Sequence, residues 1–600
     1  MTRKNIAQAP CPAERLVAEH VPSRMHVKDS TLYDFSDVAL DSARNFMGWT
    51  DLASNPPTPI DQIEEFARGV ADDDINYVGL LGEGGSSQAP MTITKLCAAL
   101  HPRVRFSTLD SLSPVYVRQI LRGVDYAHAI FIVSSKSGGT LETLSLYHVI
   151  WEDVVRELGE QEAGKHFVAI TDPGSDLEKL ARERSFRGVF LGEPTVGGRF
   201  SALSVFGLVP AALCGLDVRD MVTRAAEMER MCSQDNLNNP AVQLASFLIT
   251  NHSPASANCF TYISPQPGRV FGLWMEQLIA ESLGKDGKGV VPHIEIDVNL
   301  LNHHQPMHPV VVYHTNADST FDREASMLSP NVPQRSYMLE DPMDIGRHFV
   351  LWEYATAFMG WLMEVPPFNQ PDVQAAKTNT KAILAGHLPD RTHRLAEPWV
   401  CAEYSDEFAS QTGIVDPTQM RSVDSVIDAF MSLVEPGCWI SVNAFLPFTG
   451  ERRGPMEVIR HTLARHLRVP CSLEIGPRYL HSTGQLQKGG ENTGLFLILS
   501  GNEVNDLEVP GTQYSLGQLE VAQSKGDLET LSAKGRRALH LHMIDTDADT
   551  LWRLAHAFEE AGTRIAIKRA LGKEGAPQDE LRDCVGGNLG RGPRVCTAAR

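Results

Sequence analysis

A repeating rhythm that starts near residue 75 constrains the fold more than any other feature of this sequence. A short apolar run is followed by a Gly-, Ser- or Thr-rich break and then by a stretch with helical spacing of apolar positions. Such alternation is typical of a parallel sheet whose strands are joined by helices. The expected strands of the first unit are Ile75–Leu81, Ala129–Ser135, His166–Thr171 and Val189–Leu191, and its expected helices include Thr140–Leu158 and Asp176–Glu183.

The same rhythm resumes after a polar stretch at residues 232–239, which predicts a second unit of similar type. Its expected strands are Cys259–Ser264, Pro309–Thr315, Cys438–Phe448, Cys471–Tyr479, Thr493–Ser500 and Arg537–Ile544. Its expected helices are Gly272–Leu283, Ile345–Met363, Pro371–Leu384, Met456–Leu467 and Thr550–Ala561.

The predicted fold class is α/β, with two doubly wound, flavodoxin-like parallel-sheet domains, an N-terminal helical arm and a C-terminal extension. The expected division of the chain is an arm at 1–60, a first domain at 61–235, a second domain at 236–384 and 431–570, an irregular insertion at 385–430 and a loose tail at 571–600.

Charge and cysteine usage exclude several classes of function. The chain has 54 basic and 74 acidic residues, a net charge of −20, which offers no footprint for nucleic acid. Ten cysteines are scattered without metal or disulfide spacing. No apolar run is long enough to cross a membrane, and the N-terminus lacks the apolar middle of a signal peptide. We expect a cytoplasmic protein that binds no membrane.

The most informative segment is AIFIVSSKSGGTLET at residues 129–143, where a buried strand leads through hydroxyls and glycines into a helix. Glycines in such a turn let successive N–H groups point at one anion, and the helix N-terminus adds positive potential. A phosphate would be bound by the hydroxyls and the lysine, and the acid would hold a lysine or a sugar hydroxyl. The candidate ligands are Ser135, Lys136, Ser137, Thr140 and Glu142.

The string S-S-K-S-G-G-T-L-E-T resembles the phosphate loop of sugar-isomerase (SIS) domains, and in detail that of the glucose-6-phosphate isomerase family. Gly139 departs from the threonine common there. A second loop, LLGEGGSSQAP at 80–90, resembles the first Gly-rich turn of the same family and would place Ser86 near the ligand. Glu83 stands in it where an apolar residue is more usual. The resemblance implies that both predicted domains are of SIS type.

Two further segments carry residues suited to proton transfer. In TVGGRFSALSVFG, Arg199 follows Gly198 and precedes a helix that is nearly all apolar, so its guanidinium needs a partner or a ligand. By the resemblance, Arg199 faces an enediolate oxygen and Gly198 lines the site. In EQLIAESLGKDGKG, Glu281 ends an apolar helix. The resemblance makes Glu281 the general base, because one carboxylate can move a proton between adjacent carbons. Without it, Arg199 would be a structural ion pair and Glu281 a solvated helix-end acid.

The segment PPFNQPDVQAAKTNTKAIL at 366–384 resembles the Gln and Lys signature of the family and maps Gln370 and Lys377 onto its ligand contacts. The spacing of these two residues puts both on one helical face. The resemblance implies that Lys377 assists ring opening. A solvated helix lysine is the alternative.

The family also uses a ring-opening histidine on a Gly-Gln loop, and here the best candidate is His481 in His-Ser-Thr-Gly-Gln. Its late position resembles the isomerase half of fused transaldolase–glucose-6-phosphate isomerases, in which a second histidine often stands at the place of Gln487. The run NHHQPMH, with His303, His304 and His308, lacks helical ligand spacing and accompanying acids. We therefore expect no metal site there.

The predicted function is interconversion of glucose 6-phosphate and fructose 6-phosphate through a cis-enediolate, without metal or redox cofactor. One alternative is the same chemistry on mannose or aminosugar 6-phosphates. Another is a phosphosugar-binding protein without catalysis, or a paralogue that lost activity. The resemblance also implies a homodimer. The expected ligand is a small sugar phosphate, and neither nucleic acid nor a membrane is expected as a partner.

Overall fold

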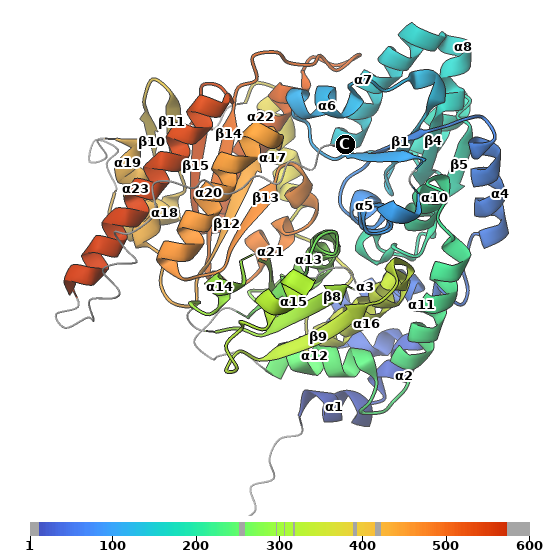
Figure 1. The fold of residues 1–600 in the computed structure, drawn as a ribbon, viewed down its shortest axis with the longest axis horizontal. Coiled ribbons are helices and arrows are strands. Elements are labelled where there is room, and N and C mark those ends of the chain that lie inside the picture. The colour runs from blue at the N-terminus through green and yellow to red at the C-terminus, as the bar shows by residue number, and fades with distance from the viewer. Residues whose placement is uncertain are drawn as a thin grey trace, which may run out of the picture.

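A computed structural model describes residues 11–101, 103–250, 258–295, 297–304, 307–315, 319–387, 393–414 and 422–572. Strands in these residues form three sheets that helices cover (Figure 1). The predicted α/β class with parallel sheets is confirmed. Within the described ranges, no helix combines the length and apolar character needed to cross a membrane.

An arm of short helices opens the described chain and packs on the long helix α16 (Ile345–Met363). The buried Tyr33 hydroxyl donates a hydrogen bond to the Ala357 carbonyl at 2.8 Å, and the Tyr354 hydroxyl donates to the Thr50 carbonyl at 2.7 Å. Because each buried hydroxyl has a partner, the arm is fixed to the body of the protein. Its elements are α1 (Pro12–Ala18), α2 (Val21–His26), η1 (Ser30–Tyr33), α3 (Asp37–Phe46), η2 (Gly48–Asp51) and α4 (Ile60–Ala71).

The first sheet has the strand order β2-β1-β3-β4-β5, with parallel neighbours throughout. Its strands are β1 (Tyr77–Leu81), β2 (Arg105–Leu109), β3 (Ala129–Ser134), β4 (Phe167–Thr171) and β5 (Gly188–Leu191). From β1 the chain goes to β2 on one side and then to β3 on the other. This reversal makes a switch point, where open α/β sheets bind ligands beyond the carboxyl ends of their strands.

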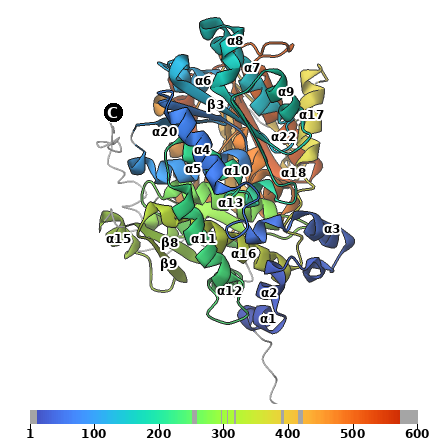
Figure 2. The ribbon, with the colours of Figure 1, turned by 90° about the vertical axis from the view of Figure 1, so that its right-hand side faces the viewer.

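Helices cover both faces of this sheet, as Figure 2 shows for α4, α5 and α10 on one side. They are α5 (Gly85–Leu96), α6 (Pro114–Leu121), α7 (Leu141–Leu158), α8 (Glu160–Ala163), α9 (Asp176–Glu183) and α10 (Val205–Leu213), with η3 (Ala98–Leu100), η4 (Tyr126–His128), η5 (Gly164–His166) and η6 (Gly198–Phe200).

The second sheet is parallel and has the order β7-β6-β8-β9. Its strands are β6 (Cys259–Ile263), β7 (Val291–Ile294), β8 (Val310–Thr315) and β9 (Gln334–Leu339). Its helices, besides α16, are α11 (Val218–Cys232), α12 (Pro240–Thr250), α13 (Arg269–Leu283), α14 (Val298–Leu301), α15 (Ser319–Ala325) and η7 (Pro342–Asp344).

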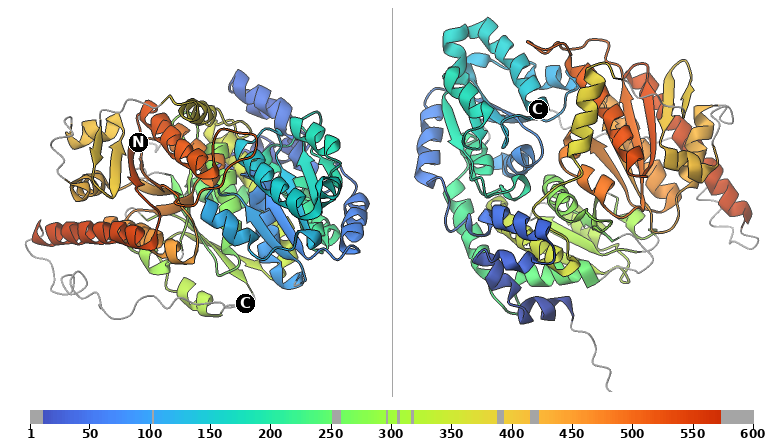
Figure 3. Two further views of the ribbon diagram at one scale, coloured as in Figure 1. Left: turned by 90° about the horizontal axis from the view of Figure 1, so that it is seen from above. Right: turned by 180° about the vertical axis from the view of Figure 1, so that it is seen from behind.

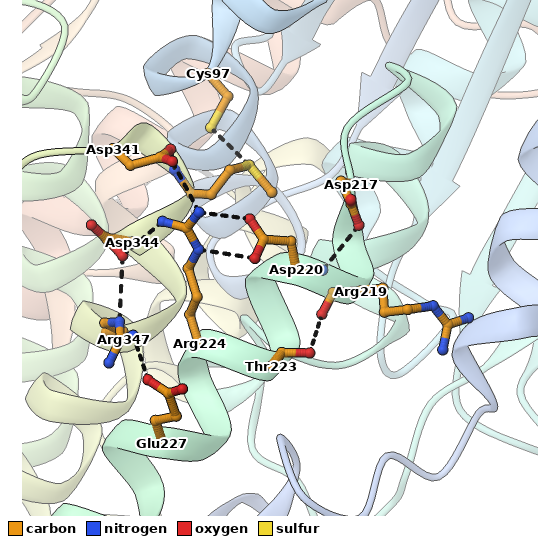
Figure 4. A network of polar contacts seen from close by, with 11 residues as sticks. Cys97, Asp217, Arg219, Asp220, Thr223, Arg224, Glu227, Asp341, Asp344 and Arg347 are labelled. Atoms are coloured by element: carbon orange, nitrogen blue, oxygen red, sulfur yellow. Dashed lines mark hydrogen bonds and ion pairs between the residues drawn. The ribbon is translucent and has the colours of Figure 1, made fainter.

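A network of ion pairs ties α11 to the start of α16 (Figure 4). The Arg224 guanidinium donates to the carboxylates of Asp220, Asp341 and Asp344 at 2.9 to 3.0 Å. Because three carboxylates surround it, the pKa of Arg224 is raised. The network shares no residue with the site described below and serves the packing of the two helices.

The third sheet has the order β10-β11-β15-β14-β12-β13, in which β11 is antiparallel to both of its neighbours, β10 and β15, and the other neighbours are parallel. Its strands are β10 (Arg394–Ala396), β11 (Val400–Tyr404), β12 (Trp439–Phe445), β13 (Cys471–Ile475), β14 (Gly494–Gly501) and β15 (Arg537–Met543).

Figure 3 shows α17 beside α22 over this sheet and α23 running outward from it. The helices of this part are α17 (Gln374–Leu384), α18 (Asp406–Thr412), α19 (Val423–Ser432), α20 (Gly450–Leu467), η9 (Arg478–His481), α21 (Gly484–Gly489), α22 (Leu516–Ala533) and α23 (Ala548–Gly572).

The expectation of an irregular insertion at 385–430 is wrong for its described part. Residues 393–414 and 422–430 contain β10, β11, α18 and most of α19. In β11, Val400, Ala402 and Tyr404 are buried while the residues between them are only half-buried. Such a short alternating strand is masked in the sequence by its polar surroundings. The strands expected after residue 236 lie in the second and third sheets together, and most of the tail at 571–600 lies outside the described residues.

Candidate active site

The predicted phosphate loop forms the turn between β3 and α7, beside the switch point of the first sheet. Ser135 Oγ lies 2.8 Å from Thr140 Oγ1, so these hydroxyls close the turn. Gly138 has a φ of +70°, and a Cβ there would lie 2.7 Å from Ser175 Cβ. Thr140 is the N-cap residue of α7, but its side chain makes no capping bond. Ser137 is exposed. The loop therefore offers hydroxyls and N–H groups at a helix N-terminus.

The lysine of this loop is engaged within the protein. Lys136 Nζ forms an ion pair with Asp172 and donates to the Pro194 carbonyl at 3.4 Å. Asp172 follows β4, the next strand of the sheet. The charge of Lys136 is thus shared with a neighbouring carboxylate, and phosphate binding by Lys136 stays a prediction.

Glu142, in the first turn of α7, is a buried carboxylate with two partners. Its Oε1 lies 3.0 Å from His481 Nε2 and accepts a hydrogen bond from Gln523 Nε2 at 2.6 Å. Burial by itself would raise the pKa of Glu142, but the charge and hydrogen bond of His481, with help from Lys377, lower it to about 2. Glu142 is therefore ionised at neutral pH.

The structure brings His481, which the sequence could not place, to the same end of the sheet. Besides its contact with Glu142, its backbone carbonyl accepts a hydrogen bond from Gln277 Nε2 at 3.0 Å. Gly84 packs against it, since a Cβ at that position would lie 2.8 Å from the His481 carbonyl oxygen. The side chain of His481 is 16% exposed, so the imidazole is held in place yet accessible.

Glu281 lies near the end of α13, with its side chain 12% exposed. Its Oε1 is 3.5 Å from Arg199 Nη1, and its Oε2 accepts from Gln277 Nε2 at 3.2 Å. Gln277 thus touches both Glu281 and His481. A carboxylate held on both oxygens in this way has a fixed direction of attack.

Arg199, in η6, is buried and spans several segments of the chain. It donates through Nε to Ser282 Oγ at 2.7 Å, through Nη1 to Gln370 Oε1 at 3.1 Å, and through Nη2 to the carbonyls of Pro367 and Asn369. Burial lowers the pKa of Arg199, and the neighbouring Glu281 opposes that shift. Both edges of the guanidinium fork are used, a geometry that lysine cannot reproduce.

Gln370 and Lys377 are both exposed. Gln370 contacts Arg199, as stated above, and Lys377, on α17, lies close enough to Glu142 for its charge to lower the pKa of that carboxyl. Because α17 begins at Gln374, Gln370 lies outside the helix, and the expectation that the two residues share one helical face is wrong.

The first Gly-rich turn lines the site from β1. Gly84 has a φ of +57°. A Cβ at Gly85 would lie 2.0 Å from the Gly198 carbonyl oxygen, so the two glycine turns pack directly on each other. Ser86, buried, is in the first turn of α5. The backbone of these turns needs glycine because of close contact, and at Gly84 also because of its left-handed conformation.

Sequence reasoning missed Gln277 and Gln523 as members of this constellation. Gln277 lies one helical turn before Glu281, so the i, i+4 spacing was a usable signal. Gln523 is on α22, and nothing near it in the sequence pointed to Glu142. Lys285 is also close: it is buried, donates to Asn369 Oδ1 at 3.0 Å, and burial together with Arg199 holds its pKa well below the usual range.

The departures from the family pattern have plain structural settings. In the described part of the chain, no atom beyond the adjoining residues lies within 4 Å of where a Cβ on Gly139 would be. Gln487 is buried, and both ends of its side-chain amide are hydrogen-bonded within the protein, to Asn443, Ser441 and Thr483. His304 and His308 are buried beside each other, whereas His303 is exposed. Among the described residues, no group of three or more His, Cys, Asp or Glu side chains is arranged to hold a metal ion.

The arrangement combines a hydroxyl- and glycine-rich turn at a helix N-terminus, a carboxylate beside a buried guanidinium, and an imidazole paired with a second carboxylate. A carboxylate of this kind can remove and return a proton, and a fixed cation beside it stabilises an oxyanion. An imidazole paired with a carboxylate can exchange a proton with a sugar oxygen. Such a site suits proton transfer on a phosphorylated carbonyl compound.

Comparison with known proteins agrees with this chemistry. The phosphoglucose isomerase family model matches residues 61–298. Glucose-6-phosphate isomerase of Mycoplasmopsis pulmonis is 29% identical over 389 residues, which cover 56% of this chain and 90% of that protein. The enzyme of the same name from Carboxydothermus hydrogenoformans is 26% identical over 401 residues, covering 56% of this chain and 85% of that protein.

A hypothetical protein of Thermus thermophilus has a similar structure, with a TM-score of 0.51 and 22% identity over 62% of this chain and 97% of that one. This likeness supports the fold alone. By the match over residues 61–298 and by the curated relatives, the chain is similar to the glucose-6-phosphate isomerase family.

Proposed function

We propose that this chain is an aldose–ketose isomerase that interconverts glucose 6-phosphate and fructose 6-phosphate. The observation that carries the proposal is the carboxylate of Glu281 held 3.5 Å from the buried Arg199 guanidinium, with a Gly- and Ser-rich anion turn at the same end of the first sheet. The reaction transfers protons between adjacent carbons and needs no change of oxidation state supplied from outside.

The phosphate would bind at the N-terminus of α7, through Ser135, Ser137, Thr140 and the backbone N–H groups of the turn. Lys136 would contribute positive potential beside it. Ser86 and Gly198, on the two glycine turns that pack together, would line the sugar, and Gln370 would bind it beside Arg199. These assignments combine positions in the structure with the resemblance of the motifs.

Ring opening requires a proton donor for the ring oxygen and an acceptor for the hydroxyl proton. His481 is suited to this step, because Glu142 is ionised and its contact fixes the direction of the imidazole. Lys377, on α17, would assist this step, because its charge already lowers the pKa of Glu142.

Isomerisation of the open chain would follow at Glu281. Its carboxylate takes the proton from one carbon and returns it to the neighbouring one, while Gln277 holds its direction. Arg199 would face the enediolate oxygen. Its fixed positive charge stabilises that oxyanion more than the neutral carbonyl, so it lowers the barrier.

We also propose a homodimer in the cytoplasm. Apolar side chains at the end of α11 and before α12 are unusually open, with Met231 46% and Leu237 48% exposed. The described cysteines are free thiols, which suits a reducing compartment. The late position of His481 supports a kinship with the isomerase half of the fused enzymes. Light scattering of the purified chain tests the dimer.

The function is tested by a coupled assay of the purified chain with fructose 6-phosphate in the presence of EDTA, beside Glu281→Gln. We expect metal-independent turnover that falls about a hundredfold to ten-thousandfold in the variant. The matched control is Glu353→Gln, which changes a buried carboxyl on α16 and should retain turnover.

Equal turnover of the Glu281→Gln variant and the parent would exclude Glu281 as the base. If the parent and both variants bind sugar phosphate saturably but none of them turns it over, the chain is a phosphosugar-binding protein or an inactive paralogue and not an isomerase. Faster turnover of mannose or aminosugar 6-phosphates would change the substrate and keep the chemistry.

A further inference from the structure

Three neighbouring strands of the first sheet each lead to an acidic residue at their carboxyl ends. Asp110 follows β2, Glu83 follows β1, and Glu142 begins α7 after β3. The strand order β2-β1-β3 places Glu83 between the other two. All three side chains are buried. This row of carboxyl groups borders the switch point at which the proposed substrate binds.

Two basic side chains of η9 contact the outer members of the row. Arg478 donates to both oxygens of Asp110, at 2.7 and 2.8 Å, and His481 Nε2 lies 3.0 Å from Glu142 Oε1. The Arg478 side chain is 14% exposed and that of Asp110 is fully buried. The short helix η9 is thus fastened to the first domain at both of its ends.

The middle acid, Glu83, lacks a hydrogen-bond partner in the part of the chain that the structure describes. Glu83 is 7% exposed, and neither of its carboxyl oxygens has a hydrogen-bond partner among the described residues. A buried polar group left without a partner costs about 1–3 kcal/mol. A buried carboxylate without a counter-ion costs more and avoids this by taking up a proton. Such groups in native proteins call for a functional explanation.

The surroundings of Glu83 favour its neutral form. Burial raises its pKa well above the usual range, the charges of Asp110 and Glu142 raise it further, and Arg478 opposes them. Tyr116, from α6, also faces it. Lys95, from α5, adds charge near Asp110 and Arg478 but is exposed to solvent.

We propose that Glu83 is a positioning residue, a neutral carboxyl group that does not compete for the basic side chains of η9. Arg478 therefore stays paired with Asp110 and His481 with Glu142, which keeps the imidazole at the active site. If Glu83 were ionised, it would compete with Asp110 for Arg478 and would loosen the attachment of η9, which carries His481. A third negative charge beside Glu142 would also repel the substrate phosphate. Activity should therefore decline at alkaline pH as Glu83 loses its proton.

This inference rests on the proposed isomerase activity, and its test has two readouts. The first is kcat/KM for fructose 6-phosphate over a range from about pH 6 to pH 10, where such profiles report the ionisations of the free enzyme. Glu83→Gln keeps the shape and cannot ionise. We expect the alkaline decline of the parent to disappear, or to move upward by at least about one pH unit.

The second readout needs no turnover. Hydrogen exchange of residues 478–484 is compared at neutral and alkaline pH, after correction for the intrinsic rate. Loosening of η9 at alkaline pH is expected in the parent and not in Glu83→Gln. The control is Glu353→Gln, since Glu353 is also buried with a raised pKa but lies on α16 beside Glu229. It should behave as the parent in both readouts.

Superimposable pH profiles and exchange rates of Glu83→Gln and the parent would overturn the proposal. A folded Glu83→Gln variant without activity at any pH would also overturn it, because it would make Glu83 catalytic. Exchange that differs as expected in a parent without isomerase activity would refute the proposed function and leave this role of Glu83 standing. Turnover with identical pH profiles and identical exchange rates in the two proteins would support the proposed function and refute this role of Glu83.

Discussion

The phosphate turn and the third-sheet region contribute to the active site in different ways. The turn is one continuous segment, residues 135–142, in which Ser135 contacts Thr140 five residues later. The third-sheet region contributes single side chains over long separations in the chain. His481 meets Glu142 across 339 positions, and Gln523 meets the same carboxyl across 381.

This difference separates a proposed binding element that folds locally from proposed catalytic groups whose positions depend on how the third sheet packs against the first. The phosphate turn needs only its own strand and helix. His481 needs the third sheet to sit correctly against the first, with Gln277, Gly84 and Glu142 as its contacts. Changes at the docking contacts should therefore affect catalysis, while changes in the turn should affect substrate affinity.

The largest effect in the comparison is expected at Arg199→Lys, because Arg199 links the first domain to α13 and to the segment before α17. Lysine cannot make the forked contacts to Ser282, Gln370 and the carbonyls. We expect kcat to fall about a hundredfold to a thousandfold, as when an oxyanion donor is removed. Steady-state kinetics, with circular dichroism to check the fold, measures it.

The control is Arg224→Lys, a forked arginine in the network of Figure 4 that shares no residue with the site. It should keep kcat. If Arg199→Lys instead raised KM and left kcat intact, Arg199 would bind substrate without stabilising the enediolate.

A smaller effect is expected at His481→Gln, which tests the docking side directly. We expect kcat/KM to fall about tenfold to a hundredfold, below the usual range for an acid–base residue because Lys377 remains. The loss should shrink with a substrate analogue that cannot close into a ring, and stopped-flow kinetics compares the two substrates. An equal loss on both would place His481 in the enediol step.

The same variant predicts a change in acid stability. The folded pKa of Glu142 is about 2, below its ordinary value of 4.5, so its contribution to stability is present above pH 4.5 and is lost as the pH falls toward 2. The contribution is on the order of 3 kcal/mol. In His481→Gln this acid-side loss should be weaker, because burial without the imidazole raises the pKa of Glu142. Thermal unfolding from about pH 6 to pH 3 measures both proteins. Parallel curves would show that His481 does not set the ionisation of Glu142.

The smallest effect is expected at Gly139→Thr, within the phosphate turn. The position is open, and its φ is not in the left-handed region, so the threonine should fit without strain. We expect a lower KM for the sugar phosphate by about twofold to fivefold, the worth of one added hydrogen bond, with kcat retained. Gly138→Thr is the contrasting variant, because its φ of +70° and the contact with Ser175 forbid a side chain. A raised KM for Gly139→Thr would show that the open space is needed by the ligand.

Much of the fold could be predicted from the sequence, because buried parallel strands are apolar runs with glycine-rich ends. The predicted helices Asp176–Glu183 and Ile345–Met363 match α9 and α16 in their bounds. The strands missed were outer ones or short ones. β2 and β9 each lie at the edge of a sheet and carry exposed polar residues, so they lack a continuous apolar run.

The sequence by itself determined the residue types of the site wherever a local motif carried them, as at Ser135–Thr140, Arg199 and Glu281. Only the tertiary structure decided that His481 meets Glu142 and that Gln277 joins His481 to Glu281. It also decided that Glu83 lies between two paired carboxylates without a hydrogen-bond partner among the residues that the structure describes. The physical reason is that a turn and its helix dipole arise from neighbouring residues, whereas an ion pair or a missing partner depends on how distant elements pack.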